Sequence, residues 1–321
     1  MDMFFDLSSL QPVTQVFGSL FVLLLVATLV SFMLSRSKPQ TDYSELTQRI
    51  NSWWIMMGVF ALSLYMGPMV TILMFAMLSF IALKEYFSMT PTRLVDRRVL
   101  FWAYLTIPLQ YYFISIGWYG MFIIFIPVYA FLFIPFRMVL AGETKNYLRA
   151  VGNIHWGLML TVFTLSHLAY LVVLPNEAEV KNLMVSGSGA ALLLYLVLLT
   201  QLNDVSQYVW GKLFGKNKIA PAISPNKTRE GLIGGVLTTG LLAMALAETL
   251  TPMLWWHGLL VGLGIGMAGF IGDVSLSAIK RDIGIKDCGQ LIPGHGGILD
   301  RLDSLTFTAP LFFHVIRYCY Y

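Results

Sequence analysis

FGSLFVLLLVATLVSFML, residues 17 to 34, decides the class of fold. The stretch has no charged side chain, and its length is close to the roughly 20 residues that a helix needs to cross a bilayer. A similar block, HWGLMLTVFTLSHLAYLVVL, occupies residues 155 to 174. The ten-residue alternation that is typical of a transmembrane barrel is absent. The chain is therefore predicted to be an all-α, polytopic integral membrane protein.

The composition of the whole chain supports this class. Of 321 residues, 57% are hydrophobic and 12% are charged, against about 25% charged residues in a typical soluble domain. About ten transmembrane helices are predicted, at residues 16–34, 53–66, 69–83, 99–116, 118–136, 155–174, 187–203, 232–250, 255–273 and 304–320. The second and third are short and meet at Gly67-Pro68, so they form either two spans or one bent or re-entrant unit.

Basic residues predict the orientation of these helices. Nineteen of the 21 Lys and Arg residues lie in alternate loops, within 36–49, 84–98, 137–149, 212–229 and 280–301. By the positive-inside rule these loops face the cytoplasm, and both termini face outward. We expect a bacterial inner-membrane protein with its active site at the cytoplasmic face.

Polar residues are distributed unevenly between two regions of the chain. Residues 1–150 are predicted to form an N-terminal multi-span membrane region with few polar residues inside its spans. Residues 151–321 are predicted to form a C-terminal multi-span catalytic region with cytoplasmic loops at 203–231 and 274–303. The chemistry is therefore expected in these two loops.

The first polar loop has the features of an anion site. Ser224, Lys227 and Thr228 come directly before an expected helix start. Free N–H groups at a helix N-terminus, with hydroxyls and a lysine nearby, bind phosphate. The loop is not a P-loop, because Gly-x4-Gly-Lys-Ser/Thr is absent. An ordinary basic loop that contacts anionic lipid headgroups is an equally good interpretation.

The second polar loop combines carboxylates with basic side chains. Asp273, Ser277 and Lys280 share a face if the preceding helix continues. Asp300 and Asp303 share a face if the last helix starts near residue 298. Carboxylates beside a bilayer are costly, which favours a functional role, and hard oxygen ligands suit Mg²⁺ with substrate phosphates.

Basic residues around these carboxylates would neutralise the remaining phosphate charge: Lys280, Arg281, Lys286 and Arg301. The set predicts a nucleotide-phosphate site, and a salt-bridge network between the two loops is the alternative. His295, which lies among glycines, contacts phosphate, acts as an acid or base, or caps a helix. Cys288 is expected to be a bystander, since no His/Cys cluster has zinc spacing.

These residues resemble the phosphatidate cytidylyltransferases, also called CDP-diacylglycerol synthases. SAIKRDIGIKDCGQLIPGHGGILDRLD, at 277–303, matches that family's signature without a mismatch at its defined positions. The first loop also resembles the family through Asp204, Tyr208, Gly211, Phe214-Gly215-Lys216 and SPNKTREG at 224–231. Gln207 departs from the small residue that the family often has before the Tyr. A paralogue with another lipid-phosphate acceptor is therefore an alternative.

The resemblance implies transfer of CMP from CTP to phosphatidate, which gives CDP-diacylglycerol and pyrophosphate. It implies one or two magnesium ions, and leaves a monovalent cation open. The implied metal ligands are Asp273, Asp300 and Asp303. The implied catalytic residues are Lys280, Arg281 and Asp300. The implied substrate-binding residues are Ser224, Lys227, Thr228, Ser277, Lys286, His295 and Arg301. The expected partners are CTP, phosphatidate and membrane lipids, without nucleic acid, and a homodimer is left open.

Two other functions compete with this prediction. A CTP-dependent polyprenol or lipid kinase would use a similar nucleotide site, but it would transfer the γ-phosphoryl group and release CDP. A cation-coupled transporter would place acidic residues near the middle of the membrane. The clustering of acids with lysines at one membrane face disfavours the transporter.

Overall fold

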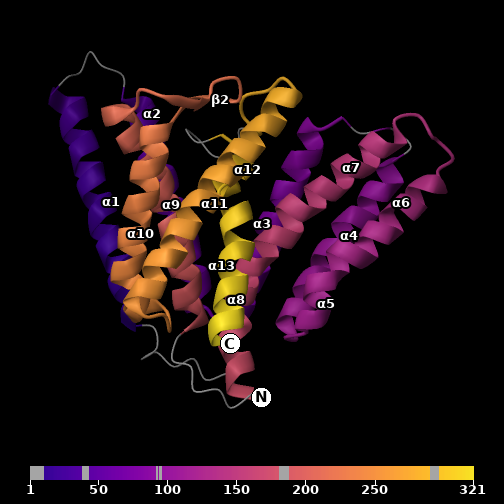
Figure 1. Ribbon diagram of the computed structural model, residues 1–321, viewed down its shortest axis with the longest axis horizontal. Coiled ribbons are helices and arrows are strands. Elements are labelled where there is room, and N and C mark those ends of the chain that lie inside the picture. Colours follow the sequence, from indigo (N-terminus) through magenta and orange to yellow (C-terminus); the bar gives the residue numbers. More distant parts are fainter. Residues whose placement is uncertain (1–10, 38–42, 92, 94–95, 181–187, 290–295) are drawn as a thin grey trace.

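The computed structural model describes residues 11–37, 43–91, 93, 96–180, 188–289 and 296–321, and its described part is a bundle of long helices (Figure 1). The elements are α1 (Gln11–Ser37), α2 (Ser44–Tyr65), α3 (Pro68–Met89), α4 (Arg97–Ser115), α5 (Tyr119–Ile124), η3 (Phe125–Ala130), α6 (Phe131–Val139), α7 (Tyr147–Leu158), η4 (Met159–Phe163), α8 (Thr164–Val180), α9 (Gly189–Phe214), β1 (Lys218–Ala220), β2 (Ser224–Thr228), α10 (Arg229–Leu250), α11 (Trp255–Asp282), α12 (Leu299–Leu302) and α13 (Leu305–Tyr320). The π-helical segments η3 and η4 join their neighbours into two longer helices.

The helical membrane-protein class is confirmed. Seven helices of the described chain are long and apolar enough to cross a membrane: Gln11–Ser37, Pro68–Met89, Tyr119–Val139, Tyr147–Pro175, Gly189–Phe214, Arg229–Leu250 and Trp255–Asp282. The other three expected spans coincide with α2, α4 and α13, of which α13 has 16 residues. The number of ten spans therefore stays a prediction.

The second and third expected spans lie in two separate helices, α2 and α3, and the way in which they cross the membrane stays a prediction. α2 and α3 each contain 22 residues. Gly67 turns the chain between them with a φ of 105°, a conformation that glycine adopts without steric cost. Pro68 then starts α3, where its missing N–H would have had no helical partner anyway.

Much of the two expected polar loops is regular structure. α9 continues to Phe214 and α11 to Asp282, although both apolar runs end some ten residues earlier. Beyond its apolar run, α9 packs against the start of α10, where a Cβ added to Gly234 would lie 2.4 Å from the ring of Trp210. β1 and β2 form an antiparallel pair with Lys218 opposite Thr228, a small sheet that the all-α prediction missed.

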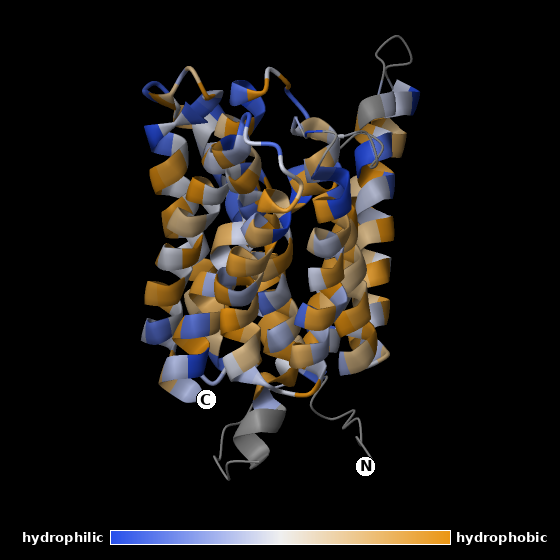
Figure 2. Cartoon of the chain, turned by 90° about the vertical axis from the view of Figure 1, so that its right-hand side faces the viewer, coloured by the Kyte–Doolittle hydropathy of each residue, from blue (hydrophilic) through white to orange (hydrophobic). Residues whose placement is uncertain are grey.

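Both polar segments lie at one end of the bundle. Figure 1 shows β2, the start of α10 and the end of α11 at the end opposite the C-terminus. Figure 2 shows hydrophilic residues gathered at this end, while the sides of the helices are mostly hydrophobic. The connections after α6 and α11, two of the expected cytoplasmic loops, also leave from it. The side of the membrane that this end faces stays a prediction.

Buried apolar residues from both predicted regions form one continuous core. α10 packs closely on α9 and α11 in this core. Gly235 of α10 lies so near α9 that an added Cβ would be 2.3 Å from Gln207 Cγ. This close approach brings the polar faces of α9, α10 and α11 together at the hydrophilic end.

Candidate active site

Three aspartates from distant segments form what we call the carboxylate cluster: Asp204 on α9, Asp273 on α11, and Asp303 between α12 and α13. Ser304 links two of them, because its hydroxyl donates to Asp204 Oδ1 at 3.1 Å and its backbone N–H donates to Asp303 Oδ1 at 2.7 Å. Burial and the neighbouring carboxylates of Asp273 and Asp204 raise the pKa of Asp303 well above its usual range. Three acidic side chains therefore converge at this point, and the protonated form of Asp303 is favoured.

Lys227 of the first polar segment contacts this cluster. Its Nζ lies 2.6 Å from Asp273 Oδ2, and the side chains are 19% and 22% exposed. The same Nζ donates to Gln207 Oε1 at 3.2 Å and lies 5.8 Å from the centre of the Phe270 ring. Residues of both polar segments thus meet at one place, as expected for a shared site.

Lys280 and Asp300 form a separate, more buried ion pair. Lys280 Nζ lies 2.8 Å from Asp300 Oδ1, with the side chains 12% and 6% exposed. Asp300 Oδ2 accepts the backbone N–H groups of Cys288 at 2.8 Å and Gly297 at 3.0 Å. Burial raises the pKa of Asp300, but the bonds from Lys280 and the two N–H groups outweigh it and lower the pKa overall. Asp300 is therefore an ionised carboxylate whose two oxygens are both engaged.

The expected face of Asp273, Ser277 and Lys280 is present. Ser277 is buried on α11, and its hydroxyl donates to Asp273 Oδ1 at 3.3 Å. Asp303 joins Asp273 in the carboxylate cluster, whereas Asp300 pairs with Lys280, about two turns further along the same face of α11. The predicted metal ligands are thus divided between two neighbouring groups.

Two predicted site residues have clear structural contacts. Arg281 donates to the backbone oxygens of Ile223 and Ile285, each at 3.2 Å, and so ties α11 to the connection between β1 and β2. Thr228 is buried and caps α10, because its hydroxyl accepts the N–H of Gly231 at 3.2 Å. The bond from Arg281 to Ile223 joins the two polar segments, whereas the Thr228 cap fixes the start of α10 within the first segment.

The other predicted residues differ in their surroundings. Ser224 begins β2 and is partly exposed, and Lys286 is exposed. Arg301 has a buried Nε without a hydrogen-bond partner in the part of the chain that the structure describes. His295 lies outside the described residues.

Glu85, at the end of α3, is a site residue that the sequence did not indicate. Its Oε2 accepts the backbone N–H of Leu299 at 2.7 Å across 214 residues of sequence. A Cβ added to Gly289 or Gly297 would lie 2.2 or 2.4 Å from Glu85 Oε1. The N-terminal region thus supplies a carboxylate that holds the start of α12, one residue before Asp300. In the sequence, the one feature that could have indicated Glu85 is its position at the end of an apolar run.

The donor atoms of the carboxylate cluster are of the type that magnesium prefers. Mg²⁺ binds one or two carboxylates and keeps oxygen ligands from water or phosphate. The cluster supplies three carboxylates, and Lys227 contacts one of them, Asp273. In the present arrangement, however, no three His, Cys, Asp or Glu side chains among the described residues are close enough to hold a metal ion. The cluster fits magnesium in chemistry, and magnesium binding stays a prediction.

Comparisons with known proteins identify the family. The model of the cytidylyltransferase family matches residues 47–319. The uncharacterized protein YnbB of Escherichia coli K12 is 45% identical over 304 residues, covering 95% of this chain and 98% of that protein. Phosphatidate cytidylyltransferases of Staphylococcus epidermidis and Staphylococcus aureus are 43% identical over 126 residues, which is 39% of this chain and 48% of theirs. The chain therefore belongs to the cytidylyltransferase family.

Proposed function

We propose that this protein transfers CMP from CTP to phosphatidate at the cytoplasmic face of a bacterial inner membrane, giving CDP-diacylglycerol and pyrophosphate. The observation that carries the proposal is the contact between Lys227 and Asp273. It joins the two segments that resemble phosphatidate cytidylyltransferases into one basic and acidic site at the end of an apolar helical bundle. The staphylococcal relatives bear the name of that activity, over about half of their length.

The reaction requires charge neutralisation more than proton transfer. An oxygen of the lipid phosphate attacks the α-phosphorus of CTP, the bond from that phosphorus to the bridging oxygen breaks, and pyrophosphate leaves with the electron pair. The attacking phosphate is already anionic, so no strong base is needed. Lys227 and Lys280 are placed to neutralise phosphate oxygens, and such preorganised charge is a large part of catalysis in phosphate chemistry.

We assign the magnesium ligands to Asp273 and Asp303, with Asp204 next to them. Bound magnesium would stabilise the negative charge of the phosphates. Asp300 has both oxygens engaged by Lys280 and two backbone N–H groups, so we assign it to positioning Lys280. This differs from the expectation that Asp300 is itself a metal ligand.

Gln207 stands where the family often has a small residue, and this difference favours an alternative acceptor substrate. Gln207 is buried and contacts Lys227, so it borders the proposed phosphate site. The same CMP transfer to another lipid phosphate is therefore our alternative to phosphatidate.

The test is an incubation of purified protein with labelled CTP, Mg²⁺ and a panel of lipid phosphates. Pyrophosphate and CDP-diacylglycerol are expected with phosphatidate. Release of CDP with a phosphorylated lipid would establish a kinase instead. CMP transfer only to another lipid phosphate would support the alternative acceptor. No CTP-dependent product with any lipid would refute both proposals.

A further inference from the structure

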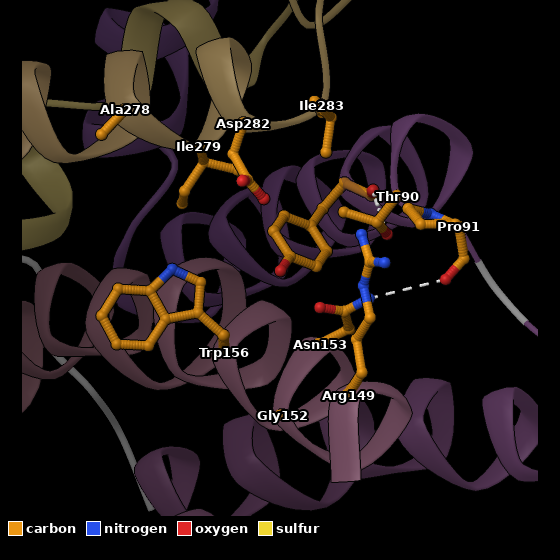
Figure 3. Close-up of a pocket in the computed structure, with 11 residues that line it drawn as sticks. Thr90, Pro91, Arg149, Gly152, Asn153, Trp156, Ala278, Ile279, Asp282 and Ile283 are labelled. Atoms are coloured by element: carbon orange, nitrogen blue, oxygen red, sulfur yellow. Dashed lines mark hydrogen bonds between the residues drawn. The ribbon is translucent and has the colours of Figure 1, made fainter. Parts of the chain in front are cut away.

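A cavity of about 480 Å³ lies between the end of α3, the start of α7 and the end of α11 (Figure 3). Its wall on α11 includes Ile279 and Asp282. Lys280, by contrast, points to Asp300 in the candidate active site. Neighbouring residues of a helix point about 100° apart, so the cavity and the active site lie on different faces of α11. The cavity is a separate site at the hydrophilic end of the bundle.

Opposite charges project into this cavity from facing helices. Figure 3 shows Arg149 reaching in from α7 and Asp282 from α11. Within the described parts of the chain, neither side chain has an ion-pair partner within 4.0 Å. Asp282 is also the last residue of α11, where the helix dipole disfavours a carboxylate. A ligand with a cationic group would remove this unfavourable arrangement.

The remaining lining suits the boundary between membrane and water. The side chain of Tyr86 is only 2% exposed, and its hydroxyl makes no hydrogen bond with the described residues. Trp156 is 48% exposed, as expected for a residue at a membrane interface. Ile279 and Ile283 add apolar surface. A few converging polar groups in a partly apolar cavity are typical of a ligand site.

We propose that this cavity binds the headgroup of a zwitterionic phospholipid that carries a primary amine, with its phosphate on Arg149 and its ammonium on Asp282. Arginine forms strong, directional hydrogen bonds with phosphate. A primary ammonium donates up to three hydrogen bonds, whereas a quaternary ammonium donates none and satisfies the carboxylate less well. An anionic headgroup would satisfy Arg149 and be repelled by Asp282. The position of the cavity leaves the acyl chains in the bilayer.

Competition among lipids tests the charge assignment. The purified full chain is mixed with equal amounts of dioleoyl phosphatidylethanolamine, phosphatidylcholine and phosphatidylglycerol, and retained lipid is measured by native mass spectrometry; phosphatidate is left out because the proposed active site would bind it. We expect phosphatidylethanolamine to be retained roughly tenfold over the others, the effect of one hydrogen bond to a charged group. In Asp282→Asn, the ratio of retained phosphatidylethanolamine to retained phosphatidylcholine should fall to about one. Arg149→Gln should lower retention of every phospholipid, and Lys145→Gln, an exposed charge outside the cavity, should change nothing.

A filling substitution tests the cavity itself. A Cβ added to Gly152, which lines the cavity, would meet no atom within 4 Å. Gly152→Leu should therefore keep the wild-type melting temperature in detergent and lose the retained phosphatidylethanolamine. The proposal is overturned if the wild type retains the three lipids equally or prefers phosphatidylglycerol. It is also overturned if Arg149→Gln and Gly152→Leu retain phosphatidylethanolamine like the wild type.

Discussion

Replacing Glu85 tests whether the N-terminal region positions the candidate active site. Glu85 accepts the N–H of Leu299 at 2.7 Å, and Leu299 directly precedes Asp300. A hydrogen bond to a charged group contributes about 1.5–3 kcal/mol. Because Glu85 is partly exposed, we take the lower value, which corresponds to roughly tenfold. Glu85→Ala is therefore expected to lower kcat for CMP transfer about tenfold, with a small change in KM for CTP. Glu85→Gln keeps an acceptor and should recover most of this loss.

Thiol labelling gives a second measurement that does not depend on activity. The backbone N–H of Cys288 bonds to Asp300, and burial is the main cause that raises the pKa of the Cys288 thiol, so the wild-type thiol should react slowly. In a Cys319→Ser background, Cys288 is the remaining cysteine. Glu85→Ala should accelerate its alkylation by N-ethylmaleimide, because the turn that carries Asp300 loses an anchor.

Lys84→Ala is the matched control, since Lys84 is the exposed neighbour of Glu85. This variant should match the wild type in both measurements. Wild-type kcat and wild-type alkylation of Cys288 in Glu85→Ala would refute the positioning role. Equal losses in Glu85→Ala and Lys84→Ala would assign the effect to general disturbance of α3.

Three further substitutions test the site and its packing. Asp303→Asn should lower the rate of magnesium-dependent CMP transfer by at least 100-fold and raise the magnesium concentration that gives the half-maximal rate. If the variant has the same magnesium titration as the wild type, Asp303 is not a magnesium ligand. Gln207→Ala removes the contact with Lys227. It should change the relative rates of CMP transfer to different lipid phosphates more than it changes the KM for CTP. Unchanged relative rates would show that Gln207 does not contribute to the acceptor site. Gly235→Val should lower the melting temperature in detergent. Even a Cβ at this position would lie 2.3 Å from Gln207, and overpacking costs about 1–3 kcal/mol. An unchanged melting temperature would show that α9 and α10 can move apart.

The sequence predicted the class of fold because long uncharged blocks admit few other structures. It was less successful at the ends of helices. α9 continues beyond its apolar run because its end packs against the start of α10, and the end of α11 is held by the pairing of Lys280 with Asp300. Hydropathy along the sequence contains no information about such partners. The short β1–β2 pair was missed for a similar reason, since the pairing of Lys218 with Thr228 closes a turn within a polar, basic stretch.

Local spacing predicted local parts of the site, such as the bond between Ser277 and Asp273. It could not show which of the later aspartates joins Asp273. The turns around α12 direct Asp303 into the carboxylate cluster and leave Asp300 to Lys280 and two backbone N–H groups. Glu85 escaped prediction because its partner lies 214 residues away.

The contact between Glu85 and Leu299 has a consequence for the synthesis of the protein. Leu299 is translated 214 residues after Glu85, so the ribosome must add α4 to α11 before the two residues can meet. Contacts between residues so distant in sequence form late, because a long loop must close first. The site around Asp300 is therefore completed only after the helices between residues 85 and 299 have been synthesised. A nascent chain that has not yet reached residue 299 would lack the aligned Lys280–Asp300 pair, so it should be inactive.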